Sequence, residues 1–375
     1  MFVGFDIRPL IFTKAGIRTY LYNLILHLAR SGGCELRLFV SSKSGIDWKQ
    51  SSAFITEEVL RFPHLNSVCE RFWQEFLLPR AAGRRKIEIF HGTRFFVPAG
   101  LRCPSVVTIH DVAFKKFPAF VTPQAGRSFD GLVTSSIKRA NAVIVPSQTT
   151  KADLIELYGL SEETIRVIPD AASVELKPVT EIARIEAVKE KFSIKGKFIL
   201  FVGTIEPRKN LSCLLEAYHG AKIKDDYTLV ICGGTGWLYQ DVFVQAEKLG
   251  LKEKVVFTGH VPLDEMACLY TVCEAFVFPS LYEGFGLPVL EAMQFGKAVI
   301  TSNTSSLAEL FKDAGYLIDP RDAHALSRGL ERVLLDAGLR KELEAKSTQK
   351  ARQFSWDTTA RETLEVYQLL VKDRR

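Results

Sequence analysis

The sequence predicts a doubly wound α/β fold in two domains, and three observations lead to this prediction. The chain has 375 residues, and a single core usually stops growing at about 250 to 300 residues. Apolar runs of strand length alternate with helix-patterned stretches from one end to the other. The stretch 169–180, with two prolines and many small or polar residues, interrupts this alternation near the middle. Two successive series of strands and helices predict two sheets, each covered on both faces.

The predicted strands are almost wholly apolar, which is typical of parallel strands buried on both faces. In the first half they are FVGFDI, LRLFV, IEIFH, SVVTIHD, NAVIVPS and TIRVIP. In the second half they are KFILFVG, YTLVICG, KVVFTG, AFVFPS, KAVITS and GYLID. We therefore expect a first domain over 1–172 and a second over 173–355. By its pattern alone, the last helical segment, 356–375, can pack on either domain.

Two predicted helices show amphipathic spacing, in which apolar residues step by three and one. The apolar face of the first consists of Ile17, Tyr20, Leu21, Leu24, Ile25 and Leu28. That of the second consists of Leu211, Leu214, Leu215 and Tyr218, after Asn210 as the expected N-cap. A further helix is expected to begin near Pro288, because proline suits the first helical turn.

Composition and charge narrow the class of protein. A hydrophobic fraction of 47% and a charged fraction of 25% describe an ordinary globular protein. No apolar run approaches the ~20 residues that span a bilayer, and the first residues lack signal-peptide features, so we expect a cytoplasmic protein. Seven cysteines without a C-x-x-C pair indicate neither a disulfide framework nor a zinc site.

The net charge of +6 is modest, but some basic residues cluster. One cluster lies at 80–86, and the other is the Lys115–Lys116 pair between Phe114 and Phe117. Such patches attract phosphates or anionic lipid, and a solvated surface is the alternative interpretation. No nucleic-acid recognition motif accompanies the charge, so nucleic acid is not an expected partner.

The segment FVGTIEPRKNL predicts an anion site. It places Arg208 and Lys209 after a buried strand and before a helix N-terminus. Two cations beside the positive end of a helix repel one another unless an anion joins them. We therefore favour phosphate binding here, with a surface ion pair as the alternative.

The segment SLYEGFGLPVLEAM places Glu283 and Glu291 on either side of a glycine-rich turn. Gly284 and Gly286 permit backbone angles that other residues resist. A strand, a glycine turn and a helix N-terminus together form an anion cradle, and carboxylates beside it can hold the hydroxyl groups of a phosphorylated ligand. In the alternative interpretation, Glu291 complements the helix dipole and Glu283 is solvated.

Two further candidates follow strands of the first half. His110 and Asp111 end the strand SVVTI, where the alternatives are a site in a cleft or a turn and cap role. Gly16 either starts a helix or lets the backbone approach a phosphate. His91, at the end of another strand, is more typical of a packed and hydrogen-bonded histidine.

Together these segments resemble family 4 of the retaining nucleotide-sugar glycosyltransferases, which includes bacterial mannosyltransferases and has the GT-B fold. The resemblance covers nearly the whole chain. It is strongest in FVGTIEPRKNLSCLLEAY, in FPSLYEGFGLPVLEAMQFGKAVITSNTSSLAEL, in VVTIHDVAFKKFP and in RANAVIVPSQTTKADL. The spacing of Glu283 and Glu291, E-x7-E, is specific in this context.

The resemblance implies two Rossmann-like domains facing a central cleft, an acceptor-binding first domain and a donor-binding second domain. The final helix, 356–375, is expected to cross back to the first. Glu291 is expected to hold the donor ribose, Glu283 to lie near the donor sugar, and Lys209 with Arg208 to neutralise the diphosphate. The remaining implied site residues are Phe285, Gly286, Leu287, Val261, Gly16 and His110.

The implied activity is transfer of a hexose, with mannose as the first guess, from a GDP-sugar or UDP-sugar to a saccharide or lipid-linked glycan acceptor of surface polysaccharide synthesis. No metal is required if cations and helix N–H groups stabilise the leaving diphosphate. The two basic clusters prompt a peripheral contact with the inner membrane. A sugar-nucleotide epimerase and an inactive nucleotide-sugar-binding partner are the alternatives.

Overall fold

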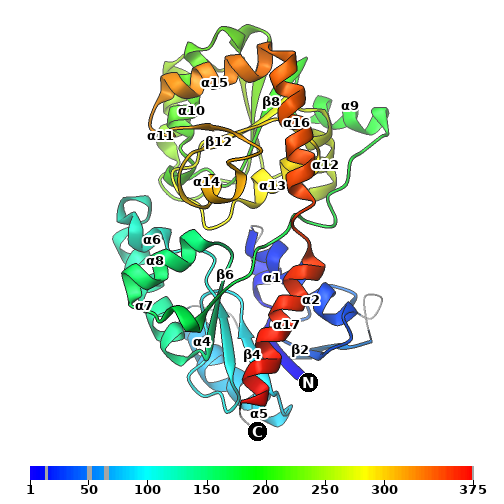
Figure 1. Cartoon of the computed structure of the whole chain (residues 1–375), viewed down its shortest axis with the longest axis vertical. Helices are drawn as coiled ribbons and strands as arrows, with labels where there is room; N and C mark the ends of the chain where they lie inside the picture. The colour runs from blue at the N-terminus through cyan, green and yellow to red at the C-terminus, as the bar shows by residue number, and fades with distance from the viewer. Residues whose placement is uncertain (13–15, 49–52, 63–66, 374–375) are drawn as a thin grey trace. The chain divides into compact units, whose positions relative to one another are not determined.

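The computed structural model describes residues 1–12, 16–48, 53–62 and 67–373. The chain divides into two compact units, each built around one parallel sheet (Figure 1). Unit 1 consists of Met1–Pro118, Pro123–Ala171 and Ser355–Arg375. Unit 2 consists of Ala119–Thr122 and Ala172–Phe354.

The sheet of unit 1 has the strand order β3-β2-β1-β4-β5-β6-β7 within the described residues. Its strands are β1 (Phe2–Asp6), β2 (Glu35–Val40), β3 (Ile55–Val59), β4 (Ile89–Gly92), β5 (Ser105–Thr108), β6 (Ala142–Val145) and β7 (Ile165–Val167). Its helices are α1 (Pro9–Phe12), α2 (Gly16–Arg30), α4 (Ser67–Phe72), the π-helix η1 (Trp73–Leu77), α5 (Leu78–Arg84), α6 (Ala113–Lys116), α7 (Pro123–Arg139), α8 (Gln148–Tyr158) and α17 (Trp356–Lys372), with the short turn η3 (Glu162–Thr164). The short turn η2 (Pro118–Phe120) begins in unit 1 and continues into unit 2.

The sheet of unit 2 has the order β10-β9-β8-β11-β12-β13 within the described residues. Its strands are β8 (Lys197–Val202), β9 (Tyr227–Cys232), β10 (Val255–Gly259), β11 (Ala275–Phe278), β12 (Val299–Ser302) and β13 (Tyr316–Ile318). Its helices are α9 (Ile182–Lys191), α10 (Leu211–Gly220), α11 (Gln240–Lys248), α12 (Leu263–Val272), α13 (Leu287–Gln294), α14 (Ser305–Phe311), α15 (Ala323–Leu335) and α16 (Ala337–Ala351), with short turns η4 (Pro207–Lys209) and η5 (Lys222–Asp225).

The predicted apolar runs coincide with the observed strands, and the doubly wound α/β prediction is confirmed. Only β3 was missed among the described strands. Its sequence, ITEEV, has one fully buried residue, Ile55. Because β3 lies at the edge of its sheet, it lacks the apolar run of a strand covered on both faces.

The last helix completes unit 1. Helix α17, drawn in red in Figure 1, packs along α2 and contacts β4. Ser355 caps it by accepting a hydrogen bond from the Thr358 N–H. Trp356 and Tyr367 are buried, so a segment far away in sequence supplies part of the core of unit 1.

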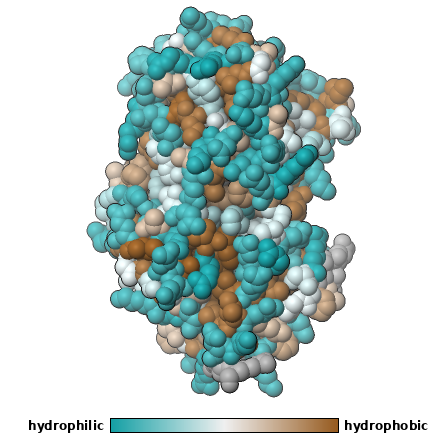
Figure 2. Space-filling view, viewed as in Figure 1, coloured by the Kyte–Doolittle hydropathy of each residue, from teal (hydrophilic) through white to brown (hydrophobic). Residues whose placement is uncertain are grey.

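The surface is polar over most of the side shown in Figure 2, with separate hydrophobic patches. Within the part of the chain that the structure describes, no helix has the length and apolar character needed to cross a membrane.

The strand order of each sheet creates one position suited to ligand binding. In unit 2, the sequence order of the strands reverses between β8 and β11, which are neighbours. In unit 1, it reverses between β1 and β4. Loops leave such neighbouring strands in opposite directions, which opens a crevice beyond their carboxyl ends.

Candidate functional site

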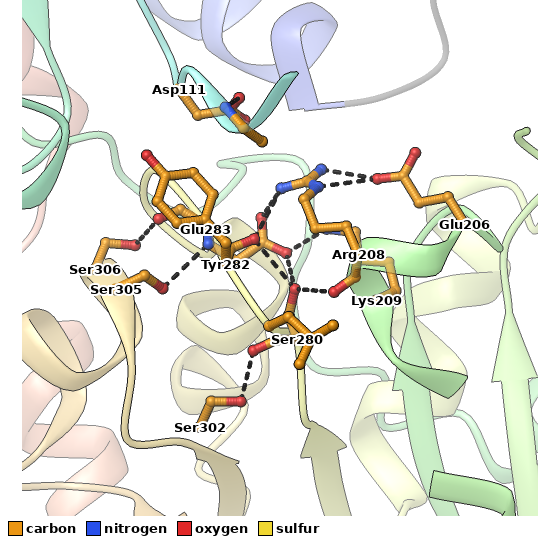
Figure 3. A network of polar contacts seen from close by, with 12 residues as sticks. Asp111, Glu206, Arg208, Lys209, Ser280, Tyr282, Glu283, Ser302, Ser305 and Ser306 are labelled. Carbon is orange, nitrogen blue, oxygen red and sulfur yellow. Dashed lines mark hydrogen bonds and ion pairs between the residues drawn. The ribbon is translucent and has the colours of Figure 1, made fainter. Parts of the chain in front are cut away.

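A cluster of charged side chains lies where β8 and β11 end, at the reversal point of the unit 2 sheet (Figure 3). The turn η4 follows β8 and carries Arg208 and Lys209. The segment after β11 carries Ser280 and Glu283. The two segments are joined directly, because the backbone N–H of Leu281 donates to the carbonyl oxygen of Arg208 at 2.9 Å.

The carboxylate of Glu283 is the centre of this cluster. Lys209 Nζ lies 2.5 Å from Oε1, and Arg208 Nη1 lies 2.7 Å from Oε2. The Ser280 hydroxyl contacts Oε1 at 2.6 Å. Burial raises the pKa of Glu283, but Arg208 and Lys209 outweigh it and leave this pKa below its ordinary value. The residue is therefore ionised at neutral pH.

Both cations are paired with carboxylates of unit 2. Glu206, a residue that the sequence analysis missed, accepts hydrogen bonds from Arg208 Nε at 3.1 Å and Nη2 at 2.9 Å. Burial and the charge of Arg208 lower the pKa of Lys209, although Glu283 and Glu206 oppose this shift. Glu283 and Glu206 thus supply the anions that these cations require, so the predicted phosphate contact has to exchange with an ion pair.

The glycine turn after Glu283 is fixed by two serines of α14. The Glu283 N–H donates to Ser305 Oγ at 3.1 Å, and the Ser306 hydroxyl donates to the Glu283 carbonyl at 2.9 Å. Gly286 has φ +104°, and a Cβ atom there would lie 2.6 Å from Leu307 Cδ2. Only glycine satisfies both conditions.

The residues around Gly286 offer backbone rather than side chains to a ligand. The ring of Phe285 is buried and packs edge-on against Phe311 and Phe354. Leu287 begins α13 and Pro288 follows it, as expected from the sequence. Pro288 has no N–H, and the N–H groups of Val289 and Leu290 donate to the Gly286 carbonyl oxygen at 3.0 Å and 3.2 Å. The backbone donor that this first turn can offer to a ligand is therefore the Leu287 N–H.

Glu291 lies in the second turn of α13, so complementing the helix dipole does not explain it. Its Oε2 accepts a hydrogen bond from the hydroxyl of Tyr270 at 3.1 Å. Tyr270 is buried on α12 and stacks on Phe295, with ring centroids 5.2 Å apart. Burial raises the pKa of Glu291 to about 7. The sequence analysis missed Tyr270 as the partner of this carboxyl group.

Asn210 differs from its expected role. It precedes α10, but its backbone is left-handed, with φ 60°, and its side chain makes no capping bond. Its amide nitrogen instead donates to the carbonyl oxygens of Pro279 at 3.1 Å and Pro320 at 2.6 Å. Asn210 is thus the N-cap residue by position, as predicted, but its side chain joins the loops that follow β8, β11 and β13 instead of capping α10.

Val261 lies between β10 and α12 and is buried in the core of unit 2. Its side chain packs inward, so Val261 itself can contact a ligand only through its backbone.

His110 follows β5 in unit 1. Its Nε2–H donates to the carbonyl oxygen of Thr93 at 2.9 Å, and its ring packs edge-on against Tyr20 and Phe95. Burial lowers its pKa, so the neutral ring presents a lone pair at Nδ1. Asp111 accepts a hydrogen bond from the Ala113 N–H at 3.0 Å. Of the two roles considered for Asp111, a cleft site or a turn and cap role, this contact corresponds to the turn role.

Gly16 is exposed and is the first residue of α2, after 13–15, which lie outside the described residues. His91 is buried between Tyr367 and Thr108, which contact its two ring nitrogens at 2.5 Å and 2.7 Å. Burial lowers its pKa to about 3. His91 therefore has the packed role that was favoured for it.

The structure thus brings together only part of the predicted site. Arg208, Lys209 and Glu283 are in direct contact within unit 2. Glu291 lies on the helix that leaves the same turn. Gly16 and His110 belong to unit 1.

Family models match both halves of the chain. The model described as "Glycosyltransferase Family 4" matches residues 15–176, and "Glycosyl transferases group 1" matches residues 184–353. The O-antigen chain mannosyltransferase B of Escherichia coli is 33% identical over 286 residues, covering 75% of this chain and 74% of that protein.

Solved structures share the whole architecture. Sucrose-phosphate synthase from Thermosynechococcus elongatus has a TM-score of 0.77 at 20% identity, over 99% of both chains. HepE from Anabaena, in complex with UDP and glucose, has a TM-score of 0.74 at 19% identity, over 97% of this chain and 98% of that one. This chain belongs to the family 4 glycosyltransferases of the GT-B fold, and it is a glycosyltransferase.

Proposed function

We propose that this enzyme moves a hexose, mannose in the first instance, from a nucleotide-diphosphate sugar to a saccharide or lipid-linked glycan of surface polysaccharide synthesis. The cluster of Arg208, Lys209 and Glu283 at the reversal point of the unit 2 sheet is the observation that carries this proposal. The name of the O-antigen chain mannosyltransferase supports the choice of sugar and acceptor class.

Unit 2 is the donor-binding unit in this proposal. Arg208 and Lys209 neutralise the diphosphate, and the positive end of the α13 dipole, with the Leu287 N–H, points at it. Glu291 accepts hydrogen bonds from the ribose hydroxyl groups, and Glu283 lies at the donor sugar. The backbone of Phe285 and Leu287 contacts sugar and diphosphate, and that of the Val261 loop contacts the base.

Unit 1 is the acceptor-binding unit. His110 lies near the reacting sugar carbon, and its neutral ring can accept a hydrogen bond at Nδ1. Gly16 lets the start of α2 approach the diphosphate from this unit.

Bond cleavage builds negative charge on the diphosphate and positive charge at the anomeric carbon. Arg208 and Lys209 stabilise the first, and the ionised Glu283 stabilises the second. These groups suffice without a metal ion in the proposed mechanism. The transfer retains the anomeric configuration, with attack from the face that the diphosphate leaves. GDP-mannose is the first donor to test and a UDP-sugar the second.

A transfer assay tests this function. Wild type is incubated with GDP-mannose or UDP-sugars, an oligosaccharide acceptor series and a chelator, and the product anomer is identified by NMR. Acceptor-dependent transfer is expected, with Lys209→Ala and Glu283→Gln each slower by at least about a hundredfold. Glu247→Gln, an exposed change on α11, is the matched control.

The other outcomes identify the alternatives. Epimerisation without an acceptor would indicate a sugar-nucleotide epimerase. Nucleotide-sugar binding without any turnover would indicate an inactive partner. Activity that returns only when a divalent cation replaces the chelator would contradict the metal-free mechanism.

We also propose peripheral contact with the inner membrane, supported by only one of the two predicted clusters. Phe114 is buried, while Lys115 pairs with Asp130 and Lys116 with Asp153. The other cluster is exposed and consists of Arg80, Arg84, Arg85 and Lys86, of which Arg85 pairs with Glu58 at 2.8 Å. Two exposed rings precede it, Phe72 and Phe76, stacked with centroids 5.1 Å apart. Aromatic rings beside cations suit an anionic lipid surface.

Flotation with phosphatidylglycerol vesicles at low salt tests this contact. Wild type is expected to bind, and the double variant Phe76→Ser with Arg80→Glu to remain in solution. Lys115→Glu serves as the control on the paired cluster. Equal flotation of all three proteins, or none for the wild type, would contradict a role for this surface.

A further inference from the structure

Glu206 occupies a place in the charged cluster that none of the proposed roles explains. Its side chain is buried, and one of its carboxylate oxygens accepts two hydrogen bonds from the guanidinium of Arg208. It lies at the start of η4 but makes no capping bond to that turn. Figure 3 shows it on the side of Arg208 away from Glu283.

The formal charges of four side chains in this cluster balance one another. Arg208 and Lys209 carry two positive charges, and Glu206 and Glu283 carry two negative charges. Charges shielded from solvent interact strongly, since little water screens them. A diphosphate carries several negative charges. In this cluster it would be repelled by two carboxylates as well as attracted by two cations. Tight binding of the diphosphate therefore requires that one carboxylate break its ion pair with a cation.

The two carboxylates are held very differently. Glu283 is fixed by Arg208, Lys209 and Ser280, and its backbone is fixed by Ser305 and Ser306.

Glu206, by contrast, accepts side-chain hydrogen bonds from Arg208 alone among the described residues. A ligand that bonds the guanidinium displaces Glu206 by breaking contacts to one partner, whereas displacing Glu283 breaks contacts to three.

We propose that Glu206 is an internal counter-ion that pairs with Arg208 in the empty site and is exchanged for the diphosphate of the nucleotide. This inference rests on the proposed donor site. Glu206 also helps to orient Arg208, because it bonds Nε and Nη2 whereas Glu283 and the Tyr282 carbonyl bond Nη1. It also weakens nucleotide binding, since an internal anion competes for the same cation. Glu206 therefore favours release of the nucleoside diphosphate product.

Calorimetric titration of GDP, UDP and ADP, and of the matching monophosphates, tests the inference. Glu206→Gln keeps the length and an oxygen acceptor for Arg208 but removes the charge. We expect this variant to bind the diphosphate that wild type accepts about tenfold more tightly, a factor equal to about 1.4 kcal/mol. We expect a smaller gain in affinity for the monophosphate. The control variant Glu247→Gln is expected to leave the affinity for every nucleotide unchanged.

A double-mutant cycle identifies the partner. In an Arg208→Gln background, Glu206→Gln is expected to add little to diphosphate affinity, because the guanidinium for which the two anions compete is gone. Unchanged or weaker diphosphate binding by Glu206→Gln would overturn the inference and leave Glu206 as a positioning residue for Arg208. Absence of all nucleotide binding by wild type would instead overturn the proposed donor site.

A second measurement does not depend on the folding of a variant. In a crystal structure of wild type with bound nucleoside diphosphate, we expect Arg208 to contact phosphate and Glu206 to have left it. Phosphate bound with both Glu206–Arg208 bonds retained would overturn the exchange.

Discussion

Lys209 shares the carboxylate of Glu283 with Arg208, and this position determines how the site responds to alkaline pH. Burial and Arg208 lower its pKa. The protonated amine binds phosphate, so nucleotide affinity is expected to fall as pH rises through this lowered pKa, earlier than for an ordinary lysine. Nucleotide dissociation constants measured from about pH 7 to pH 10 check this.

The matched variant is Lys209→Arg. A guanidinium stays charged throughout this range, so the nucleotide affinity of this variant is not expected to fall toward pH 10. A flat profile for wild type, or an equal fall in Lys209→Arg, would show that Lys209 does not carry the effect.

Glu291 gives the site a second pH response, of opposite sign. Burial raises its pKa to about 7 in the empty site. If ribose hydroxyl groups donate to the ionised carboxylate, nucleotide binding strengthens as pH rises from about 6 to about 8 and then levels off. Well below the pKa, affinity falls by up to about tenfold per pH unit.

The same titration with Glu291→Gln checks this assignment, because a neutral amide has no proton to lose. Its binding is expected to be weaker at pH 8 and independent of pH across the range. A wild-type profile that matches the variant would remove Glu291 from the ribose contact.

The secondary-structure elements show which features of the fold can be predicted from the sequence. Parallel strands covered on both faces are continuous apolar runs, so β8 and β11 are identified by composition alone. The polar edge strand β3 carries no such signal. Asn210 was placed correctly before a helix, but its left-handed backbone turns the side chain toward other loops.

The same distinction between predictable and unpredictable features holds for the candidate site. Arg208, Lys209 and Glu283 follow predicted strands, and parallel strands end at one edge of the sheet, so their proximity was predictable. The contacts that fix them come from elsewhere. Ser306 lies 23 residues beyond Glu283, and Tyr270 lies 21 residues before Glu291. Glu206 adjoins Arg208 in sequence, but its pairing depends on the backbone turn of η4.

The turn between Glu283 and α13 is expected to be intolerant of any side chain at Gly286. Gly286→Ala combines a positive φ with a Cβ contact of 2.6 Å, and we expect a loss of about 2–4 kcal/mol in unfolding free energy. Chemical denaturation measures this loss, and nucleotide titration measures the accompanying loss of affinity.

Two other glycines of unit 2 serve to distinguish backbone strain from a steric clash of the added Cβ atom. Gly250 has φ +67° and open space, so Gly250→Ala reports backbone strain alone. Gly234 has open space and no positive φ in the left-handed range, so Gly234→Ala is expected to be nearly neutral. Equal effects at all three positions would contradict a steric role for Gly286.

At the scale of the whole molecule, the two units have separate cores and are expected to respond separately. Trp356 is buried in unit 1 beside Tyr20, and Trp356→Ala is expected to destabilise that unit by about 3–5 kcal/mol. Nucleotide is expected to protect unit 2, chiefly around 203–210 and 280–291. Hydrogen exchange read by peptide measures both effects in one experiment.

Protection of unit 2 by nucleotide should persist in Trp356→Ala if donor binding belongs to that unit. Its loss in the variant, or protection confined to unit 1, would contradict the assignment of the donor site.

The place of α17 in unit 1 has a consequence for synthesis of the chain. Unit 1 begins at Met1 but includes Ser355–Arg375, whereas nearly all of unit 2 is one continuous stretch. A ribosome releases the amino-terminal sheet first, with the face that α17 covers still open. Unit 2 can complete its core while unit 1 waits for its last helix, so the first unit to emerge is the last to be finished.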